Sequence, residues 1–496
     1  MTHTPSPARL QGRLGTGSIV FMVIAAAAPL TVIGGNVPIA VGSGNGAGAP
    51  LGFLIAALVL LVFAIGFVTM TPYVREAGAF FSYATAGLGA RAGLAVAFLA
   101  LVAYTAIQVA VYGYLGWAFG DFVVFFGGPS LHWSVYAFLA LAAVAVLGYR
   151  HIELSSKVLG IALIAEIAIV VVLDAVIFMS GGAEGVVWES FAPAHVFDPG
   201  IAVAVLFALT GFIGFEATAV FRDEARDPAR TIPLATYLAV SIIGVFYAVS
   251  CWALVTGAGA QGIVALAQAT LDGKANLLVD LTGRYLGTAF QNIVQVLLAT
   301  SLFACVLSFH NIVARYQFTL ANKGVLPARL GRVHPVHASP SASSLAQTVT
   351  AAIIVGLFAA FNVEPLVGVF GSMAGVATVG MVLLMLATSV AVLAFFARNH
   401  AVRRTIVGRA VVAPLAAIIG LSLSLWLVLS HFTMITGGGV ALSALLALVP
   451  AAAFVLGYAL GGHLRIGNVE VPQTLPATAD PRIEAKQNME KLLKLD

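Results

Sequence analysis

Two glycines and a carboxylate interrupt a long apolar stretch of the sequence, residues 200–221. Gly211 and Gly214 weaken a helix, and Glu216 adds an ionisable group, at about the depth of a bilayer midplane. Backbone groups left unpaired at that depth persist only where they are buried in protein or line a cavity. The segment therefore predicts a binding site in the middle of a membrane, where Glu216 could bond the broken backbone and change protonation as the site opens.

A second interruption lies in residues 17–41. Pro29 removes a backbone donor there, and Gly34 and Gly35 follow about a turn and a half later. Breaks at matching depths in two halves of a chain are typical of inverted-repeat secondary transporters, although single kinks at Pro and Gly are common in membrane helices. The free N–H and C=O ends would suit the carboxylate and the ammonium group of an amino acid.

Such residues need membrane-spanning helices to position them, and the composition of the chain is that of a membrane protein. Apolar residues make up 60% of the 496 positions and charged residues only 9%, whereas a soluble domain carries about 25% charged residues. A soluble enzyme is therefore excluded, and we expect an all-α membrane protein with 12 transmembrane helices. The predicted spans are 17–41, 51–70, 92–120, 131–149, 158–180, 200–221, 234–256, 286–321, 344–361, 365–397, 410–431 and 438–460.

The spans divide the chain into four predicted parts. They are a cytoplasmic N-terminal tail at 1–16, a transport core at 17–397, two additional helices at 398–460 and a cytoplasmic C-terminal tail at 461–496. Inside the core the two inverted repeats would cover about 17–180 and 200–397.

The basic residues predict the orientation. With both termini inside, 22 of the 24 Lys and Arg residues fall in cytoplasmic segments, and only Lys274 and Arg284 fall outside. Excess Lys and Arg in cytoplasmic loops is the strongest sequence signal of membrane topology. Residues 261–284 are too polar to span and are expected to form an external loop with helical turns.

The motifs around the second interruption resemble those of the amino acid–polyamine–organocation (APC) superfamily of permeases. Phe212-Ile213-Gly214-Phe215-Glu216 is similar to the family signature F-x-G-F/V-E, and residues 224–233, EARDPARTIP, are similar to the loop E-x-x-N-P-x-R-x-I-P that follows it. His310-Asn311, Arg315-Tyr316 and residues 323–327 resemble the eighth helix and its exit loop. The resemblance implies a LeuT-like 5+5 inverted repeat with discontinuous helices 1 and 6, alternating access, and transport of amino acids or amines.

The expected substrate-binding residues come from both broken helices and from three further spans. They are Ala28, Thr31, Val32, Ile33, Gly34, Tyr104, Gln108, Thr210, Gly211, Phe212, Gly214, Phe309 and Ser372. The backbone of Thr31–Gly34 and Gly211–Gly214 would hold the carboxylate and amino groups. By the resemblance, Tyr104, Gln108 and Phe309 would shape a neutral, partly aromatic side-chain pocket, although a polar stripe of this kind could instead only bond helices together.

Glu166, Glu216 and His310 are the candidate coupling and gating residues. In several members of the superfamily a lysine occupies about the position of Glu166, and a carboxylate there could bind a cation or carry a coupled proton. His310 could instead be satisfied by packing. Asp174 is expected at the outer interface. Ser308 has no adjacent hydroxyl partner, so a sodium site is incomplete, which favours proton coupling or exchange.

The sequence thus favours a secondary active amino acid transporter of the cytoplasmic membrane. A neutral or aromatic amino acid is the favoured substrate, and a proton and the lipid bilayer are the expected partners. A polyamine or biogenic-amine transporter of the same fold is the closest alternative, because Glu216 or Glu166 could supply the charge. An enzyme would need a catalytic cluster and a channel would show no matched breaks, so neither is expected. Scattered basic residues speak against nucleic acid, Cys251 and Cys305 are expected to be packing residues, and no metal or cofactor is expected.

Overall fold

The computed structural model describes residues 14–74, 79–150, 156–220, 225–336 and 339–462. Within these ranges the chain forms helices joined by turns, and one isolated bridge pairs Leu14 with Ala225. Helix prevails because an apolar segment in lipid must satisfy its backbone hydrogen bonds internally. Most of both predicted tails lies outside the described residues, as do Arg75 and Arg222.

Ten stretches of the described chain are helical, long and apolar enough to cross a membrane. The count is lower than the predicted twelve for two reasons. The stretch Thr16–Tyr73 covers the first two predicted spans, and the sixth is represented by a shorter apolar helix, Ile201–Gly211. The other nine stretches agree with predicted spans to within a few residues. This content of long apolar helices is typical of a protein that crosses the membrane many times.

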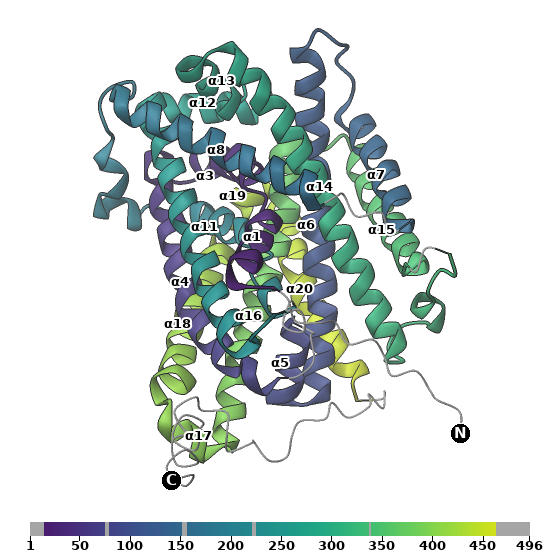
Figure 1. Ribbon diagram of the computed structural model, residues 1–496. Helices are drawn as coiled ribbons and strands as arrows, with labels where there is room; N and C mark the ends of the chain where they lie inside the picture. Colours follow the sequence, from purple (N-terminus) through teal and green to yellow (C-terminus); the bar gives the residue numbers. More distant parts are fainter. Residues whose placement is uncertain (1–13, 75–78, 151–155, 221–224, 337–338, 463–496) are drawn as a thin grey trace, which may run out of the picture.

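The helices follow one another along the chain with few long connections (Figure 1). The first half contains α1 (Thr16–Ala26), α2 (Pro29–Thr31), α3 (Val37–Ala40), α4 (Ala49–Met70), α5 (Ala79–Leu88), α6 (Ala90–Phe125), α7 (Trp133–Tyr149) and α8 (Ser156–Ser180). The second half contains α9 (Ile201–Gly211), α10 (Ala217–Val220), α11 (Pro228–Ala258), α12 (Gly262–Leu271), α13 (Leu277–Leu286), α14 (Thr288–Asn322), α15 (Ser341–Ala360), α16 (Ser372–Arg398), α17 (His400–Thr405), α18 (Ala413–Ser430), α19 (Phe432–Thr436) and α20 (Val440–Leu460). Wider π-helical turns extend some of them, at η1 (Val32–Asn36), η2 (Val41–Asn45), η9 (Pro365–Gly371) and η10 (Gly408–Val412).

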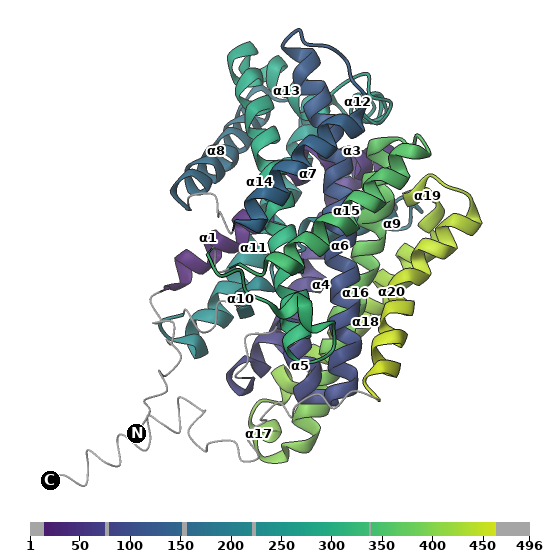
Figure 2. The ribbon, with the colours of Figure 1, turned by 90° about the vertical axis from the view of Figure 1, so that its right-hand side faces the viewer.

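Helix α6 lies at the centre of the bundle and is the most buried of the ten membrane-length stretches. It packs against α14, α16, α20 and α5 (Figure 2). Two glycines let α6 also approach η9 and α7 closely, because a Cβ atom added at Gly113 would lie 2.7 Å from Cγ1 of Val369 in η9 and one at Gly116 would lie 2.6 Å from the carbonyl oxygen of Trp133 in α7. Larger side chains at these two positions of α6 would prevent both contacts.

The two ends of the bundle differ in the elements they carry. Helices α12 and α13, which form the predicted external loop, lie at one end, and α17 with α5 lies at the other (Figures 1 and 2). α17 contributes Arg403 and Arg404 to its end. The separation of these elements agrees with the sidedness that the basic residues predict.

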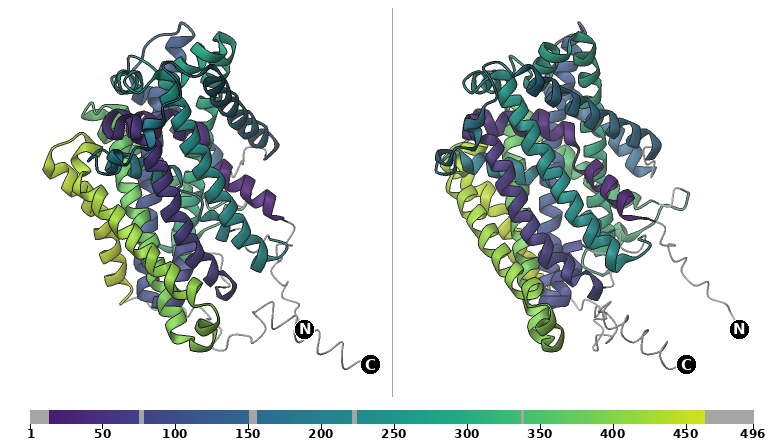
Figure 3. Two further views of the ribbon diagram at one scale, coloured as in Figure 1. Left: turned by 90° about the vertical axis from the view of Figure 1, so that its left-hand side faces the viewer. Right: turned by 60° about the vertical axis from the view of Figure 1, so that its left-hand side comes forward.

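The last two long helices lie on the periphery. α18 and α20 form the green-to-yellow outer edge of the bundle in Figure 3, and α20 is the least buried of the ten stretches. Large apolar side chains point away from the protein here, among them Leu423, Trp426 and Leu445, each about 60% exposed. A surface of this composition is compatible with hydrocarbon and not with water.

Candidate functional site

The first predicted span breaks at Ala27 and Ala28, just before the interruption predicted at residues 29–35. α1 ends at Ala26, Ala28 has a φ of 45° in the left-handed region, and α2 begins at Pro29. Proline suits the first position of a helix, since the amide it lacks would have no helical partner there. The expectation that Gly34 and Gly35 belong to the break is wrong, because both lie within the helical turn η1.

Gly34 and Gly35 have a packing role instead. A Cβ atom at Gly34 would lie 2.5 Å from the hydroxyl oxygen of Tyr114, and one at Gly35 would lie 2.7 Å from its ring. The break also moves the free amides. The Val32 amide donates to the Ala28 carbonyl (3.2 Å), so the amides that open the new helix without an earlier helical acceptor are those of Leu30 and Thr31.

The sixth predicted span breaks where the sequence predicts. α9 ends at Gly211, residues 212–216 form turns, and α10 begins at Ala217. Gly214 has a φ of 113°, a conformation that residues with a Cβ atom rarely adopt. Phe212, one of the expected binding residues, is almost fully buried at the end of α9.

The two breaks contact each other. A Cβ atom at Gly211 would lie 2.9 Å from Cγ1 of Val32, and one at Gly214 would lie 3.5 Å from the Cβ of Ala26. The Asn36 side-chain amide donates to the carbonyl of Phe207 in α9 (2.8 Å). Glycine at position 211 is therefore what lets the two broken helices approach, whereas glycine at position 214 is required by its φ.

Tyr247 of α11 completes this contact from one side. Its hydroxyl donates to the carbonyl of Ala27 (3.1 Å), an acceptor that the break frees from α1. Tyr247 is not among the residues that the sequence motifs predict for the site. A tyrosine inside an apolar span is a signal that could have suggested it, since a buried hydroxyl needs a partner.

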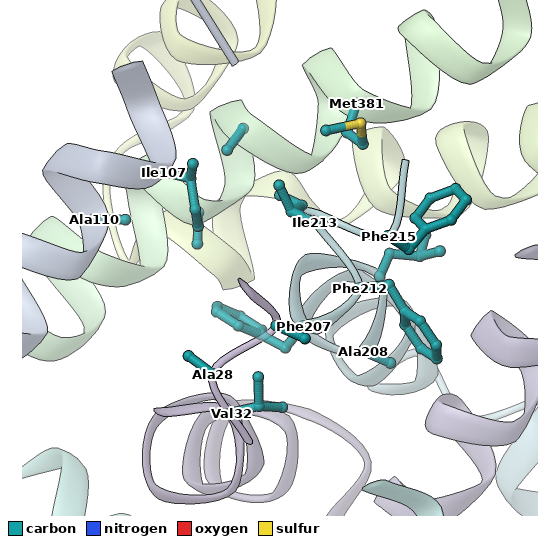
Figure 4. Packing of buried hydrophobic residues seen from close by; sticks show 14 of the residues in the cluster. Ala28, Val32, Ile107, Ala110, Phe207, Ala208, Phe212, Ile213, Phe215 and Met381 are labelled. Atoms are coloured by element: carbon teal, nitrogen blue, oxygen red, sulfur yellow. The ribbon is translucent and has the colours of Figure 1, made fainter. Parts of the chain in front are cut away.

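Apolar side chains surround the point where the breaks meet. Figure 4 shows Ile107 of α6, Ile213 of the α9–α10 turn and Met381 of α16 around the same space as Ala28 and Val32. Each of these side chains is buried. Phe207 and Phe212 lie in the same cluster, so the side chains around the breaks are both aliphatic and aromatic. The neutral, partly aromatic pocket expected from Tyr104, Gln108 and Phe309 stays a prediction.

Glu216 is bonded by two donors next to the second break. The Tyr104 hydroxyl donates to Oε1 of Glu216, and the Gly214 amide donates to Oε2 (3.0 Å). The Tyr104 ring lies 6.4 Å from the ring of Phe309 and 5.7 Å from that of Tyr316, centroid to centroid. The fold thus brings together three residues predicted for the site, Glu216, Tyr104 and Phe309.

Glu166 of α8 faces the first break. Oε2 of Glu166 accepts a hydrogen bond from the Ser301 hydroxyl of α14 (2.9 Å), and the backbone of Leu30 also bonds this carboxyl group. Ser301 in turn lies 3.4 Å from the Thr31 hydroxyl, oxygen to oxygen. A carboxylate at the start of a helix is stabilised by the unpaired amides there, so Glu166 joins α8 and α14 to the second half of the broken span.

Ser301, and not Ser308, is the hydroxyl partner in span eight. Ser308 is exposed on the outer side of α14. Ser301 precedes it by seven residues, two helical turns, and was not selected from the sequence. The expected placement of Asp174 at the interface is also wrong, because its side chain is buried and Oδ2 accepts from the Ser250 hydroxyl (2.6 Å).

Gln108 and His310 belong to a second polar cluster, between α6, α14 and α15. Nε2 of Gln108 lies 3.4 Å from Nδ1 of His310, and Oε1 of Gln108 accepts from Gln347 (2.6 Å). Nε2 of His310 lies 2.9 Å from the Ser344 hydroxyl oxygen. The side-chain polar atoms of Gln108 and His310 are therefore bonded toward α15 and not toward the two breaks.

Thr210, Ser372 and Ile33 are also among the residues predicted for the site. The Thr210 hydroxyl lies 2.5 Å from that of Thr378 and donates to the Leu206 carbonyl, which ties α9 to α16. Ser372 lies apart, since its hydroxyl donates to the carbonyl of Thr436 (3.4 Å). Ile33 is fully buried in η1. Among the described residues no group of three His, Cys, Asp or Glu side chains could hold a metal ion.

Fold and site together define a multi-pass membrane protein with two interrupted helices that meet in its interior. The sequence profile of the amino acid permease family matches residues 14–455. The chain belongs to this family, within the APC superfamily, and is a transporter and not an enzyme.

Curated relatives agree with this assignment. The chain is 24% identical over 353 residues to the branched-chain amino acid permease BcaP of Bacillus subtilis (strain 168), an alignment that covers 67% of this chain and 71% of the relative. It is 27% identical over 284 residues to an uncharacterized transporter of Rhizobium meliloti (55% of this chain, 57% of the relative). It is 25% identical over 370 residues to an uncharacterized transporter of Mycobacterium tuberculosis (73% and 77%). The resemblance expected from the sequence motifs is thereby confirmed.

Proposed function

We propose that the protein is a secondary active transporter that moves neutral amino acids with apolar side chains across the cytoplasmic membrane by alternating access. In this proposal the chain crosses the membrane twelve times with both termini inside, and residues 17–397 form a 5+5 inverted repeat. The observation that carries the proposal is the contact between two helix breaks in the interior. Broken helices in corresponding halves of a chain are the usual way in which transporters present backbone groups to a substrate.

The amide of Thr31 is the group best suited to the substrate carboxylate, because the neighbouring Leu30 amide already bonds Glu166. It lies in the first turn of a helix, where unpaired N–H groups and the helix dipole favour an anion. The turn at residues 212–216 would offer carbonyl oxygens to the substrate ammonium group. Binding of this kind recognises the part that all amino acids share and leaves the choice of side chain to the surrounding residues.

The surrounding residues favour an apolar side chain. Ile107, Ile213 and Met381 are buried around the point where the breaks meet, and burying aliphatic groups against them is favourable. The name of the Bacillus subtilis relative, a branched-chain amino acid permease, is compatible with this preference.

A polyamine transporter is less well supported. A polycation would need carboxylate oxygens directed at it, but Glu216 already accepts from Tyr104 and Gly214, and Glu166 from Ser301 and Leu30. Removing a carboxylate from such donors would leave buried groups unpaired, which costs about 1–3 kcal/mol each.

Uptake by purified protein in proteoliposomes tests the substrate class. We expect labelled leucine or isoleucine to accumulate, unlabelled phenylalanine or valine to compete, and putrescine not to compete. Competition by putrescine together with no competition by valine would overturn the proposal in favour of the amine transporter.

Glu166 is the proposed coupling residue. Adding a proton to it would weaken the bonds that hold α8 and α14 to the start of α2, and so could link protonation to movement of the broken helix. We expect Glu166→Gln to abolish the stimulation of uptake by an inward proton gradient while exchange of internal for external substrate continues.

Asp174→Asn is the matched control for Glu166→Gln. Asp174 is also a buried carboxylate of α8 that accepts from a serine hydroxyl, but its partner is Ser250 of α11 and not a residue at the break. Stimulation by the proton gradient should survive in Asp174→Asn. Equal stimulation in Glu166→Gln and in the unmodified protein would exclude the coupling role.

A further inference from the structure

A groove of about 660 Å³ opens on the outer surface of the bundle, away from the two helix breaks. Three elements form it: α4, α11, and the start of the eleventh predicted span at η10 and α18. Its lining includes Leu61, Val62, Ile65, Tyr237, Arg409 and Val412. The groove therefore joins two helices of the predicted transport core to one of the two additional helices.

The walls of the groove are apolar but its rim is charged. Leu61, Val62 and Ile65 present half-buried aliphatic side chains from α4. Arg409 is exposed at the rim and lies close enough to Tyr237 for the two groups to interact electrostatically. Aliphatic walls with a cation at one end match an amphiphile that carries a negative headgroup.

Arg409 has no anionic partner in the part of the chain that the structure describes. A guanidinium beside apolar surface binds phosphate well, because its planar N–H groups can form two parallel hydrogen bonds and it is more weakly hydrated than an ammonium group. Arg409 is thus suited to bind a phosphate at the mouth of an apolar groove, and no carboxylate of the described residues pairs with it.

The position of the groove indicates which amphiphile can reach it. Arg409 follows α17, which carries Arg403 and Arg404 at the end of the bundle that the positive-inside rule assigns to the cytoplasm. The cytoplasmic leaflet is the one rich in anionic lipids, and basic pockets between membrane helices bind their headgroups. Val412, one turn beyond Arg409, also lines the groove and is 58% exposed, so the groove is open at the surface on this side.

We propose that this groove binds an anionic phospholipid of the cytoplasmic leaflet, with the phosphate on Arg409, the Tyr237 hydroxyl as a second donor and an acyl chain against Leu61, Val62 and Ile65. The lipid would fill the seam between α4, α11 and α18, so it would hold the eleventh span against the transport core. The leaflet rests on the orientation proposed above, whereas the headgroup chemistry rests on the groove itself.

Lipid binding to delipidated protein in detergent tests the proposal without any transport substrate. Native mass spectrometry would count phosphatidylglycerol bound to the full chain, with phosphatidylcholine of the same acyl chains as competitor. We expect phosphatidylglycerol to be retained in preference to phosphatidylcholine, and Arg409→Ala to bind it about fivefold more weakly, the usual effect of one basic residue near an anionic lipid.

Two further variants distinguish lipid binding in the groove from a general effect of positive charge and from an effect of misfolding. Arg329→Ala removes an exposed arginine outside the groove and should leave phosphatidylglycerol binding unchanged. Val62→Trp fills the groove but keeps Arg409, and should also lose the lipid. Equal retention of phosphatidylglycerol by Arg409→Ala and Arg329→Ala would overturn the proposal, as would retention by a folded Val62→Trp. Because no substrate takes part, either result leaves the transport proposal untouched.

Discussion

Single residues without side chains carry the contact between the two broken helices. Gly211 leaves room for Val32, and Gly214 adopts a φ of 113° beside Ala26. A larger residue at position 211 would collide with Val32. A residue with a Cβ atom at position 214 would have a strained backbone. The proposed site therefore depends on glycines that themselves have no functional group.

Gly211→Ala tests this point. The new Cβ would lie 2.9 Å from Cγ1 of Val32, so the second half of the first span must shift, at a cost of about 1–3 kcal/mol. We expect uptake to fall at least tenfold and the thermal unfolding temperature in detergent to drop. The control is Gly17→Ala in α1, where no atom lies within 4 Å of the added Cβ, and full activity is expected. Normal uptake by Gly211→Ala would contradict the close contact.

The bond between Tyr104 and Glu216 is a second prediction at this scale. Tyr104→Phe removes one of two donors to a buried carboxylate, and an unsatisfied charged acceptor costs about 1–3 kcal/mol or more. Uptake should fall, and Glu216→Gln in the same chain should restore part of it, because a neutral amide requires less compensation. Tyr136→Phe serves as control, since that hydroxyl bonds the Pro129 carbonyl in a connecting segment. No rescue by Glu216→Gln would show that charge is not what Tyr104 compensates.

The two interrupted helices are the elements on which we propose that the substrate site is built. The first span continues beyond its break through the π-helical turns η1 and η2, and such turns often mark functional sites. Asn36 of η1 ties this half to α9 by its bond to the Phe207 carbonyl. The two halves of the proposed repeat are thus linked by a side chain as well as by glycine packing.

Asn36→Ala should remove the hydrogen bond that links η1 to α9. Loss of one buried hydrogen bond costs about 0.5–1.5 kcal/mol, so we expect a lower unfolding temperature and slower uptake. Asn399→Ala is the matched control, because its amide donates over a similar distance, 2.8 Å, to Phe395 within its own helical region. An equal effect of both variants on uptake would argue against a special role for the link between η1 and α9.

At the scale of the whole molecule, the end that carries the basic helix α17 and the end that carries α12 and α13 are expected on opposite sides of the membrane. Lys274 follows α12 and its side chain is 74% exposed, while Arg404 is exposed in α17 at the other end. The two native cysteines, Cys251 and Cys305, are buried and free. The chain is therefore suited to labelling with single introduced cysteines.

A membrane-impermeant maleimide applied to intact cells tests the sidedness. Lys274→Cys should react from outside, and Arg404→Cys should react only after the membrane is opened. The unmodified protein should stay unlabelled, because both native thiols are buried. Reaction of Arg404→Cys in intact cells would reverse the proposed orientation.

The sequence alone was sufficient for most of the long apolar helices, the position of the second break and the family. These properties depend on local composition: the length of an apolar run, a proline or glycine inside it, and a motif such as residues 212–216. Nine of the helical stretches agree with predicted spans because a segment in lipid must pair its own backbone. Glu216 was found for the same reason, as an ionisable group in an apolar run.

The partners of these residues were decided only by the tertiary structure. Thr31 meets Ser301 across 270 positions, Asn36 meets Phe207 across 171 and Tyr247 meets Ala27 across 220. Helical periodicity specifies which face a residue occupies but not which helix faces it. Gln108 therefore lies on the predicted stripe yet bonds to α15, and Asp174, expected at the surface, is buried against Ser250. Helix packing selects these contacts, because small residues and the breaks determine how closely and at what rotation each pair of helices can meet.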